Sequence, residues 1–142
     1  MVDVSGKDAT TRVAVARGRF ETTPDVLALL QSGGVAKGDA IAVARVAGIM
    51  GAKRTPDLIP LCHPVALHSV DVAFSFSESA VTIEATTRTA DRTGIEMEAM
   101  TAVAAAGLTL YDMVKALDRS ARLTDVELVR KEGGTSGSWS RP

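Results

Sequence analysis

This sequence of 142 residues has one cysteine, few aromatic rings and almost no net charge. Because Cys62 stands alone, the chain cannot form a disulfide within itself. Aromatic residues make up 4% of the chain, which leaves little for stacking on single-stranded bases. The 16 Lys and Arg residues against 17 Asp and Glu residues give a formal net charge of −1, so we expect no nucleic-acid partner held by bulk electrostatics.

Long hydrophobic runs are also absent. The most apolar stretch, residues 40–52, is interrupted by Arg45 and is shorter than the ~20 residues that span a bilayer. No basic segment followed by an apolar one opens the sequence. We therefore expect no membrane partner and a cytoplasmic protein.

The chain does contain many small hydrophobic residues. Hydrophobic residues make up 46% of it, mostly Ala, Val and Leu, which indicates a core whose elements approach closely. A chain of this length predicts a single domain over residues 1–142. Residues 1–11 are polar and small and residues 132–142 are rich in Gly and Ser, and we expect both segments to be mobile.

The longest periodic segment covers residues 94–117. When its residues are placed at 100° intervals around a helix, one side is apolar, which predicts a helix packed on a sheet. This apolar stripe consists of Met100, Val103, Gly107, Leu110, Val114 and Leu117. A second face carries small residues, ends in Asp112 and Lys115, and can closely meet another helix or subunit. These two residues are i and i+3 neighbours, and the simpler interpretation is an ordinary surface ion pair.

The remaining patterns predict an α+β sandwich. Period-two alternation predicts strands over residues 12–20, 70–76, 80–88 and 124–129, the middle two forming a hairpin whose Val72, Phe74 and Phe76 fill the core. Helix signals predict a short helix after Thr23 and Pro24 that stops at residues 32–34, and a helix over residues 40–54 that Asp39 can cap. This order resembles a ferredoxin-like fold with helices on one face of an antiparallel sheet.

Glycines and prolines give further expectations. Gly48 and Gly51 lie inside the predicted helix 40–54 and indicate close backbone packing. Three prolines within residues 55–64 predict an irregular, constrained loop that carries Cys62 and His63. With one Cys and two His in the chain, we expect no metal site there. His63 is either a satisfied core histidine or a donor to an anionic ligand, and Cys62 on its own is a small buried hydrophobe.

Four runs of the sequence can be read together: residues 37–39, 52–64, 93–99 and 108–116. They include the specific elements Leu-Cys-His-Pro and Glu-Met-Glu. Together they resemble the MoaC family, the cyclic pyranopterin monophosphate synthases of molybdenum cofactor biosynthesis, and the resemblance covers nearly the whole chain.

The resemblance implies a lyase reaction. The substrate 3′,8-cyclo-7,8-dihydroguanosine 5′-triphosphate becomes cyclic pyranopterin monophosphate with release of pyrophosphate. Ring opening, ring closure and attack on phosphorus move protons and build negative charge, so an acid/base pair and cations are needed. The family implies no cofactor, and a divalent cation that assists pyrophosphate departure is left open.

The resemblance also implies roles for individual residues. Asp112 is the catalytic acid/base, Lys115 is its partner, and Lys37 and His63 complete the centre. The substrate-binding segments are Leu61, Cys62, His63, Met97 and Glu98, and basic positions that face the substrate are Lys53, Lys131, Arg12 and Lys7. Many family members carry a second Lys where this chain has Thr135, which puts the tail's share of phosphate binding in question.

The family further implies a homohexamer, a trimer of dimers with sites shared between subunits. A small-residue helix face of the kind described above suits such contacts. The alternative is a function without catalysis. In it the protein is a catalytically degenerate paralogue that forms an oligomer and binds a small ligand, with Asp112 and Lys115 as a surface ion pair.

Overall fold

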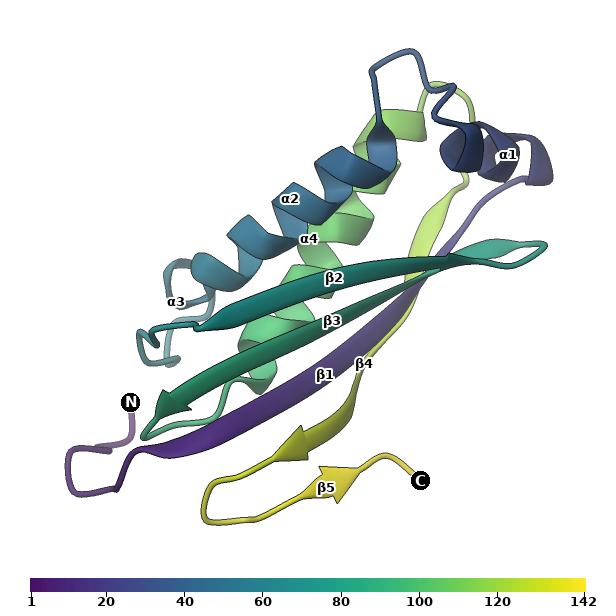
Figure 1. Ribbon diagram of the computed structural model, residues 1–142. Coiled ribbons are helices and arrows are strands. Elements are labelled where there is room, and N and C mark those ends of the chain that lie inside the picture. The colour runs from purple at the N-terminus through teal and green to yellow at the C-terminus, as the bar shows by residue number, and fades with distance from the viewer.

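The computed structural model describes all residues, 1–142, and is built on a five-stranded antiparallel sheet (Figure 1). The strand order is β2-β3-β1-β4-β5. The strands are β1 (Thr10–Glu21), β2 (Ser69–Phe76), β3 (Ala80–Asp91), β4 (Arg122–Glu132) and β5 (Trp139–Ser140). The first four strands have the order of a ferredoxin-like sheet, which confirms the predicted α+β fold, and β5 adds an edge strand.

Helices cover one face of this sheet (Figure 1). They are α1 (Pro24–Ser32), α2 (Ala40–Lys53), the single turn α3 (Thr55–Leu58) and α4 (Glu96–Val114). The long helices α2 and α4 lie side by side and run in opposite directions, whereas the other face of the sheet has no helix on it. None of the helices is long and apolar enough to cross a membrane.

Glycines allow α2 and α4 to pack closely. A Cβ atom built on Gly51 would lie 2.7 Å from the Cβ of Ala105, and one built on Gly48 would lie 3.0 Å from the backbone oxygen of Ala102. The close approach predicted from these two glycines is therefore confirmed. The sequence left open whether the small residues of α4 meet another helix or another subunit. In the structure they meet α2 of the same chain.

The core lies between the helix layer and the sheet. On α4, Val103, Leu110 and Val114 have no exposed surface, as the predicted stripe requires. Burial of a side chain such as Leu110 contributes about 1.5–3 kcal/mol. Gly18 on β1 lets α4 approach the sheet, because a Cβ there would lie 2.7 Å from Cγ1 of Val103.

Local signals place the starts of α1 and α2. The side chain of Thr23 accepts a hydrogen bond from the backbone N–H of Val26, and Asp39 accepts one from that of Ala42. Each satisfies one of the free donors in a first helical turn. Gly33 ends α1 with a φ of 74°, which glycine adopts without strain.

The end of α4 differs from the prediction of a helix over residues 94–117. The helix stops at Val114, and the backbone N–H of Leu117 donates to the Val114 carbonyl at 2.8 Å in a tighter turn. Leu117 is consequently 56% exposed and does not belong to the buried stripe.

Two smaller predictions are also corrected. Residues 55–58, expected to be irregular, form α3, because Pro56 in a first helical turn forfeits no helical hydrogen bond. On β2, Val72 is buried as predicted, whereas Phe74 and Phe76 are only partly buried beside the core. Strands β1, β3 and β4 extend beyond their predicted ends, and β5 was not predicted.

Candidate functional site

The C-terminal end of α4 carries an ion-paired cluster, called here the charged end (Lys37, Asp112 and Lys115). The Nζ of Lys115 lies 2.6 Å from Oδ1 of Asp112, and the Nζ of Lys37 lies 3.2 Å from Oδ2. Lys37 also donates to the backbone oxygen of Asp112 at 2.8 Å. All three side chains are about half exposed, so the cluster is open to a ligand.

The two lysines control the protonation of Asp112. Hydrogen bonds from Lys115 and then Lys37 hold the pKa of the Asp112 carboxyl below its ordinary value. The same contact raises the pKa of Lys115. At neutral pH the charged end therefore presents a carboxylate between two ammonium groups. The carboxylate can accept a proton, and the ammonium groups can stabilise negative charge.

The N-terminal end of α4 lines a different kind of site, called here the cavity end. It is a cavity of about 190 Å³ formed by the loop after α3 and the start of α4. Its lining residues are Leu61, Cys62, His63, Thr93, Gly94, Glu96, Met97 and Glu98. The five substrate-binding residues predicted from the loop and from the Glu-Met-Glu run, Leu61, Cys62, His63, Met97 and Glu98, thus lie together.

Burial governs the acids of the cavity end. Glu98 is 3% exposed, and this burial raises the pKa of its carboxyl, with the charge of Glu96 acting in the same direction. Burial also raises the pKa of the Cys62 thiol, helped by the charge of Glu98. At neutral pH Cys62 is therefore a neutral thiol rather than a nucleophilic thiolate.

His63 is fixed by the N-terminal segment. Its Nε2 lies 2.6 Å from the backbone oxygen of Val2, so this nitrogen carries the proton and donates. The carboxylate of Asp3 is close enough to interact electrostatically with the same ring. His63 is thus neither a core histidine nor a free side chain, and the first residues of the chain help to build the cavity end.

Of the predicted substrate-facing cations, Lys131 contacts a residue of the cavity end directly, and Arg12 is bonded to the end of the strand that leads into it. Lys131 lies 3.4 Å from Oε1 of Glu96, a cavity-lining residue. Arg12 is 9% exposed and its Nε donates to the backbone oxygen of Asp91 at 3.0 Å. Lys53 is the last residue of α2, where its charge also favours the helix dipole, and Lys7 lies exposed in the turn before β1.

Within one chain these residues form two groups and not one site. Met97 and Asp112 are separated along α4 by ~22 Å at 1.5 Å per residue. The structure brings Lys37 to Asp112 across 75 positions of sequence, but it leaves His63 at the opposite end of the helix. Each group therefore has part of the chemistry that the resemblance implies.

Three lining residues of the cavity end, Thr93, Gly94 and Glu96, were not selected from the sequence, and neither was Ser136, which contacts Lys131. Glu96 pairs with Lys131, although only the second acid of the Glu-Met-Glu run was chosen. Ser136 accepts a hydrogen bond from the Nζ of Lys131. The run itself is a signal that could have found Glu96, whereas nothing local in the sequence points to Ser136.

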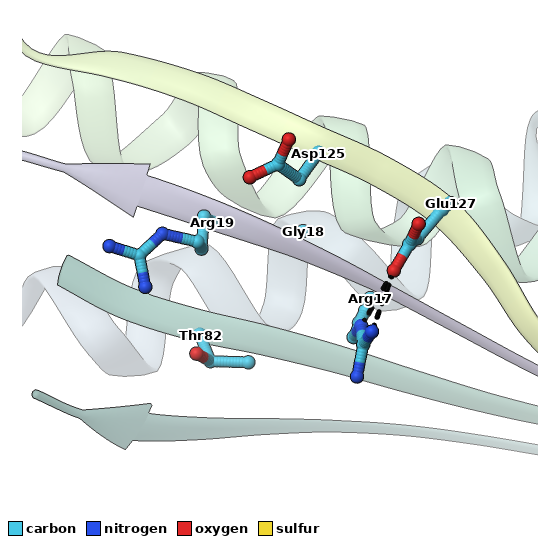
Figure 2. Close-up of a pocket in the computed structure, with 6 residues that line it drawn as sticks. All are labelled: Arg17, Gly18, Arg19, Thr82, Asp125 and Glu127. Carbon is cyan, nitrogen blue, oxygen red and sulfur yellow. Dashed lines mark hydrogen bonds and ion pairs between the residues drawn. The ribbon is translucent and has the colours of Figure 1, made fainter. Parts of the chain in front are cut away.

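A larger cavity, of about 330 Å³, lies on the helix-free face of the sheet (Figure 2). None of its lining residues, Arg17, Gly18, Arg19, Thr82, Asp125 and Glu127, is a predicted site residue. Figure 2 shows Arg17 turned toward Glu127, and Nη2 of Arg17 lies 2.8 Å from Oε1 of that carboxylate. Because the Arg17 guanidinium is already paired with a carboxylate of the same chain, it is less available to a ligand. The larger volume alone does not make this cavity a stronger candidate than the cavity end.

Comparison with known proteins now identifies the family. The model of the MoaC family matches residues 1–134. A cyclic pyranopterin monophosphate synthase from Streptomyces coelicolor is 60% identical over 141 residues, covering 99% of this chain and 83% of the relative. The cyclic pyranopterin monophosphate synthase 2 of Mycobacterium tuberculosis is 56% identical, with 99% and 84% covered, and a synthase from Thermomicrobium roseum is 55% identical, with 99% and 86% covered. The chain belongs to the MoaC family.

Proposed function

We propose that this protein is a cyclic pyranopterin monophosphate synthase, a lyase that converts 3′,8-cyclo-7,8-dihydroguanosine 5′-triphosphate to cyclic pyranopterin monophosphate and pyrophosphate. The observation that carries the proposal is the similarity over nearly the whole chain to relatives named for this synthase. A cytoplasmic location belongs to the same proposal.

The charged end supports the chemistry. Asp112 is held as a carboxylate with one oxygen facing each of two lysines. A carboxylate so placed takes up a proton during ring opening or closure and returns it, and Lys37 and Lys115 stabilise charge that develops beside it. We assign Asp112 as the acid/base, Lys115 as its partner, and Lys37 and His63 as the other catalytic residues.

The cavity end supports substrate binding. A carboxyl of raised pKa, a neutral thiol and the second ring nitrogen of His63 offer hydrogen bonds to a heterocycle, and we assign Leu61, Cys62, His63, Met97 and Glu98 to that role. Lys131, Arg12, Lys53 and Lys7 supply positive charge for the phosphates. We propose that no redox cofactor takes part.

We further propose that the site is completed by a second subunit in a hexamer built as a trimer of dimers. The cavity of about 190 Å³ is smaller than the ~300–1,000 Å³ of ordinary ligand pockets, so one chain offers too little enclosure for a nucleoside triphosphate. The outer face of α2 also exposes a continuous apolar surface formed by Val43, Val46 and Met50. Such a surface on a helix favours contact with another protein surface.

Anaerobic incubation with the cyclised dihydro-GTP intermediate tests the activity. We expect pyrophosphate and the pterin product to appear together, with and without a chelator, which also tests for a divalent cation. If neither product appears while the protein is folded and oligomeric, the chain is a degenerate paralogue that binds a small ligand.

Complementation between two inactive variants tests the shared site. We mix Asp112→Asn and His63→Ala chains after reversible dissociation. If each site takes Asp112 from one subunit and His63 from its neighbour, random pairing restores about a quarter of the wild-type sites. No recovery in confirmed mixed oligomers, or a stable monomer in light scattering at micromolar concentration, contradicts sharing.

A further inference from the structure

The chain after β4 folds back on the body of the protein in a glycine-rich turn, called here the C-terminal turn (residues 133–137). Gly133, Gly134 and Gly137 all have positive φ angles, of 86°, 79° and 66°. The backbone N–H of Gly137 donates to the Gly134 carbonyl at 3.1 Å. A Cβ on Gly133 would lie 2.2 Å from the backbone oxygen of Thr11, so the turn packs against β1 in a manner that only glycine permits.

The C-terminal turn contacts Arg12 and Lys131, two of the cations predicted to face the substrate. A Cβ on Gly134 would lie 2.2 Å from a terminal guanidinium nitrogen of Arg12, which places that side chain directly under the turn. Arg12 is 9% exposed and is tethered to the backbone oxygen of Asp91, so it has little freedom to move away. Ser136, from the same turn, accepts a hydrogen bond from the Nζ of Lys131.

The ammonium group of Lys131 is therefore held from two sides. Glu96 lies on one side, with its Oε1 3.4 Å from Nζ, and Ser136 lies on the other. The Lys131 side chain is 19% exposed, which is low for a lysine. An ammonium group has three donors, and the one hydrogen bond that Lys131 makes, to Ser136, leaves donors for a ligand. The Ser136 hydroxyl, which accepts here, keeps its own proton to donate.

We propose that Ser136 is a positioning residue that holds the Lys131 ammonium beside the cavity end for a phosphate group of the substrate. The C-terminal turn places Ser136, and its Gly134 packs against the Arg12 guanidinium. Loss of the hydroxyl leaves the ammonium paired with Glu96 alone and turned toward that carboxylate. This inference rests on the proposed function, which supplies the triphosphate as substrate.

Three variants test the role: Ser136→Ala, Ser136→Thr and, as a matched control, Ser138→Ala, an exposed serine two positions further along. We expect Ser136→Ala to raise KM for the triphosphate about tenfold, the loss of one hydrogen bond to a charged group, with kcat changed less than about twofold. Threonine keeps the hydroxyl and restores KM. Calorimetry with pyrophosphate as the probe is expected to show the same order of affinities.

The outcomes separate this inference from the proposed function. A wild-type protein without turnover overturns the function, whereas the pyrophosphate titration still compares Ser136→Ala with its control. If Ser136→Ala and Ser138→Ala have the same KM and the same affinity for pyrophosphate, Ser136 does not position Lys131. An equal loss in the alanine and threonine variants likewise overturns the inference, because it reports a damaged turn.

Discussion

The two ends of α4 treat a carboxyl group in opposite ways. Asp112 is exposed between two lysines, and their hydrogen bonds lower its pKa. Glu98 lies buried at the other end, where loss of solvation raises its pKa. One helix therefore presents an acid kept charged by its partners and an acid pushed toward its neutral form by its surroundings.

The largest effect is expected at the charged end. Asp112→Asn keeps the shape of the side chain but removes its capacity to take up a proton, so kcat is expected to fall by about 10²–10⁴. The matched control is Asp57→Asn, which alters another exposed i,i+3 ion pair, that with Arg54. Steady-state kinetics, with light scattering to confirm assembly, measure the effect. Unchanged turnover in Asp112→Asn removes this residue from the centre.

The next largest effect is expected where α2 packs closely against α4, the helix that carries both ends. Gly51→Val places a branched side chain where a single Cβ already lies 2.7 Å from Ala105, so overpacking is expected to cost about 1–3 kcal/mol of unfolding free energy. Urea unfolding measures the loss. Gly6→Ala, at a position with open space around it, serves as the control and is expected to have no effect. Equal stability of the two variants contradicts the tight α2–α4 contact.

At the cavity end, Glu98→Gln is expected to stabilise the fold at neutral pH by less than the overpacking cost above. Glu98 keeps its proton to a higher pH in the folded state than in the unfolded state. The free energy of unfolding therefore falls as pH rises from the ordinary carboxyl pKa of ~4.3 to the raised pKa of Glu98 in the folded protein. Glutamine avoids that loss, and the gain vanishes in acid, where Glu98 is protonated in both states. Thermal melts across this pH range measure the difference. A gain that persists in acid assigns the effect to packing.

Salt gives the smallest and most selective test. Screening at ~1 M salt, where the Debye length is about 3 Å, weakens the lysine contacts of the exposed Asp112 and moves its pKa upward toward the ordinary value. The pKa of Glu98 is set mainly by burial and is expected to move less. Carboxyl-carbon NMR titrations at low and high salt follow both groups. Equal movement of the two pKa values contradicts their different origins.

Local signals predicted much of the fold and some of the site. The caps at Thr23 and Asp39 placed the starts of α1 and α2. The stripe on residues 94–117 found α4 but only four of its nine buried residues. The same stripe placed Leu117 in the core, because periodicity alone does not report where the backbone turns away. The motif residues around Cys62 and Met97 do line one cavity, as their shared membership of the family pattern indicates.

Sequence by itself determined the family, the helix and strand pattern and the residue types that carry the chemistry, because caps, periodicity and short motifs act over a few residues. Only the tertiary structure decided that Lys37 meets Asp112, that Glu98 is buried, that Ser136 reaches Lys131, and that the site is split between the ends of α4. These are consequences of α2 packing against α4 and of the C-terminal turn folding back over β1. Contacts between separate elements depend on the relative placement of those elements, which no local pattern encodes.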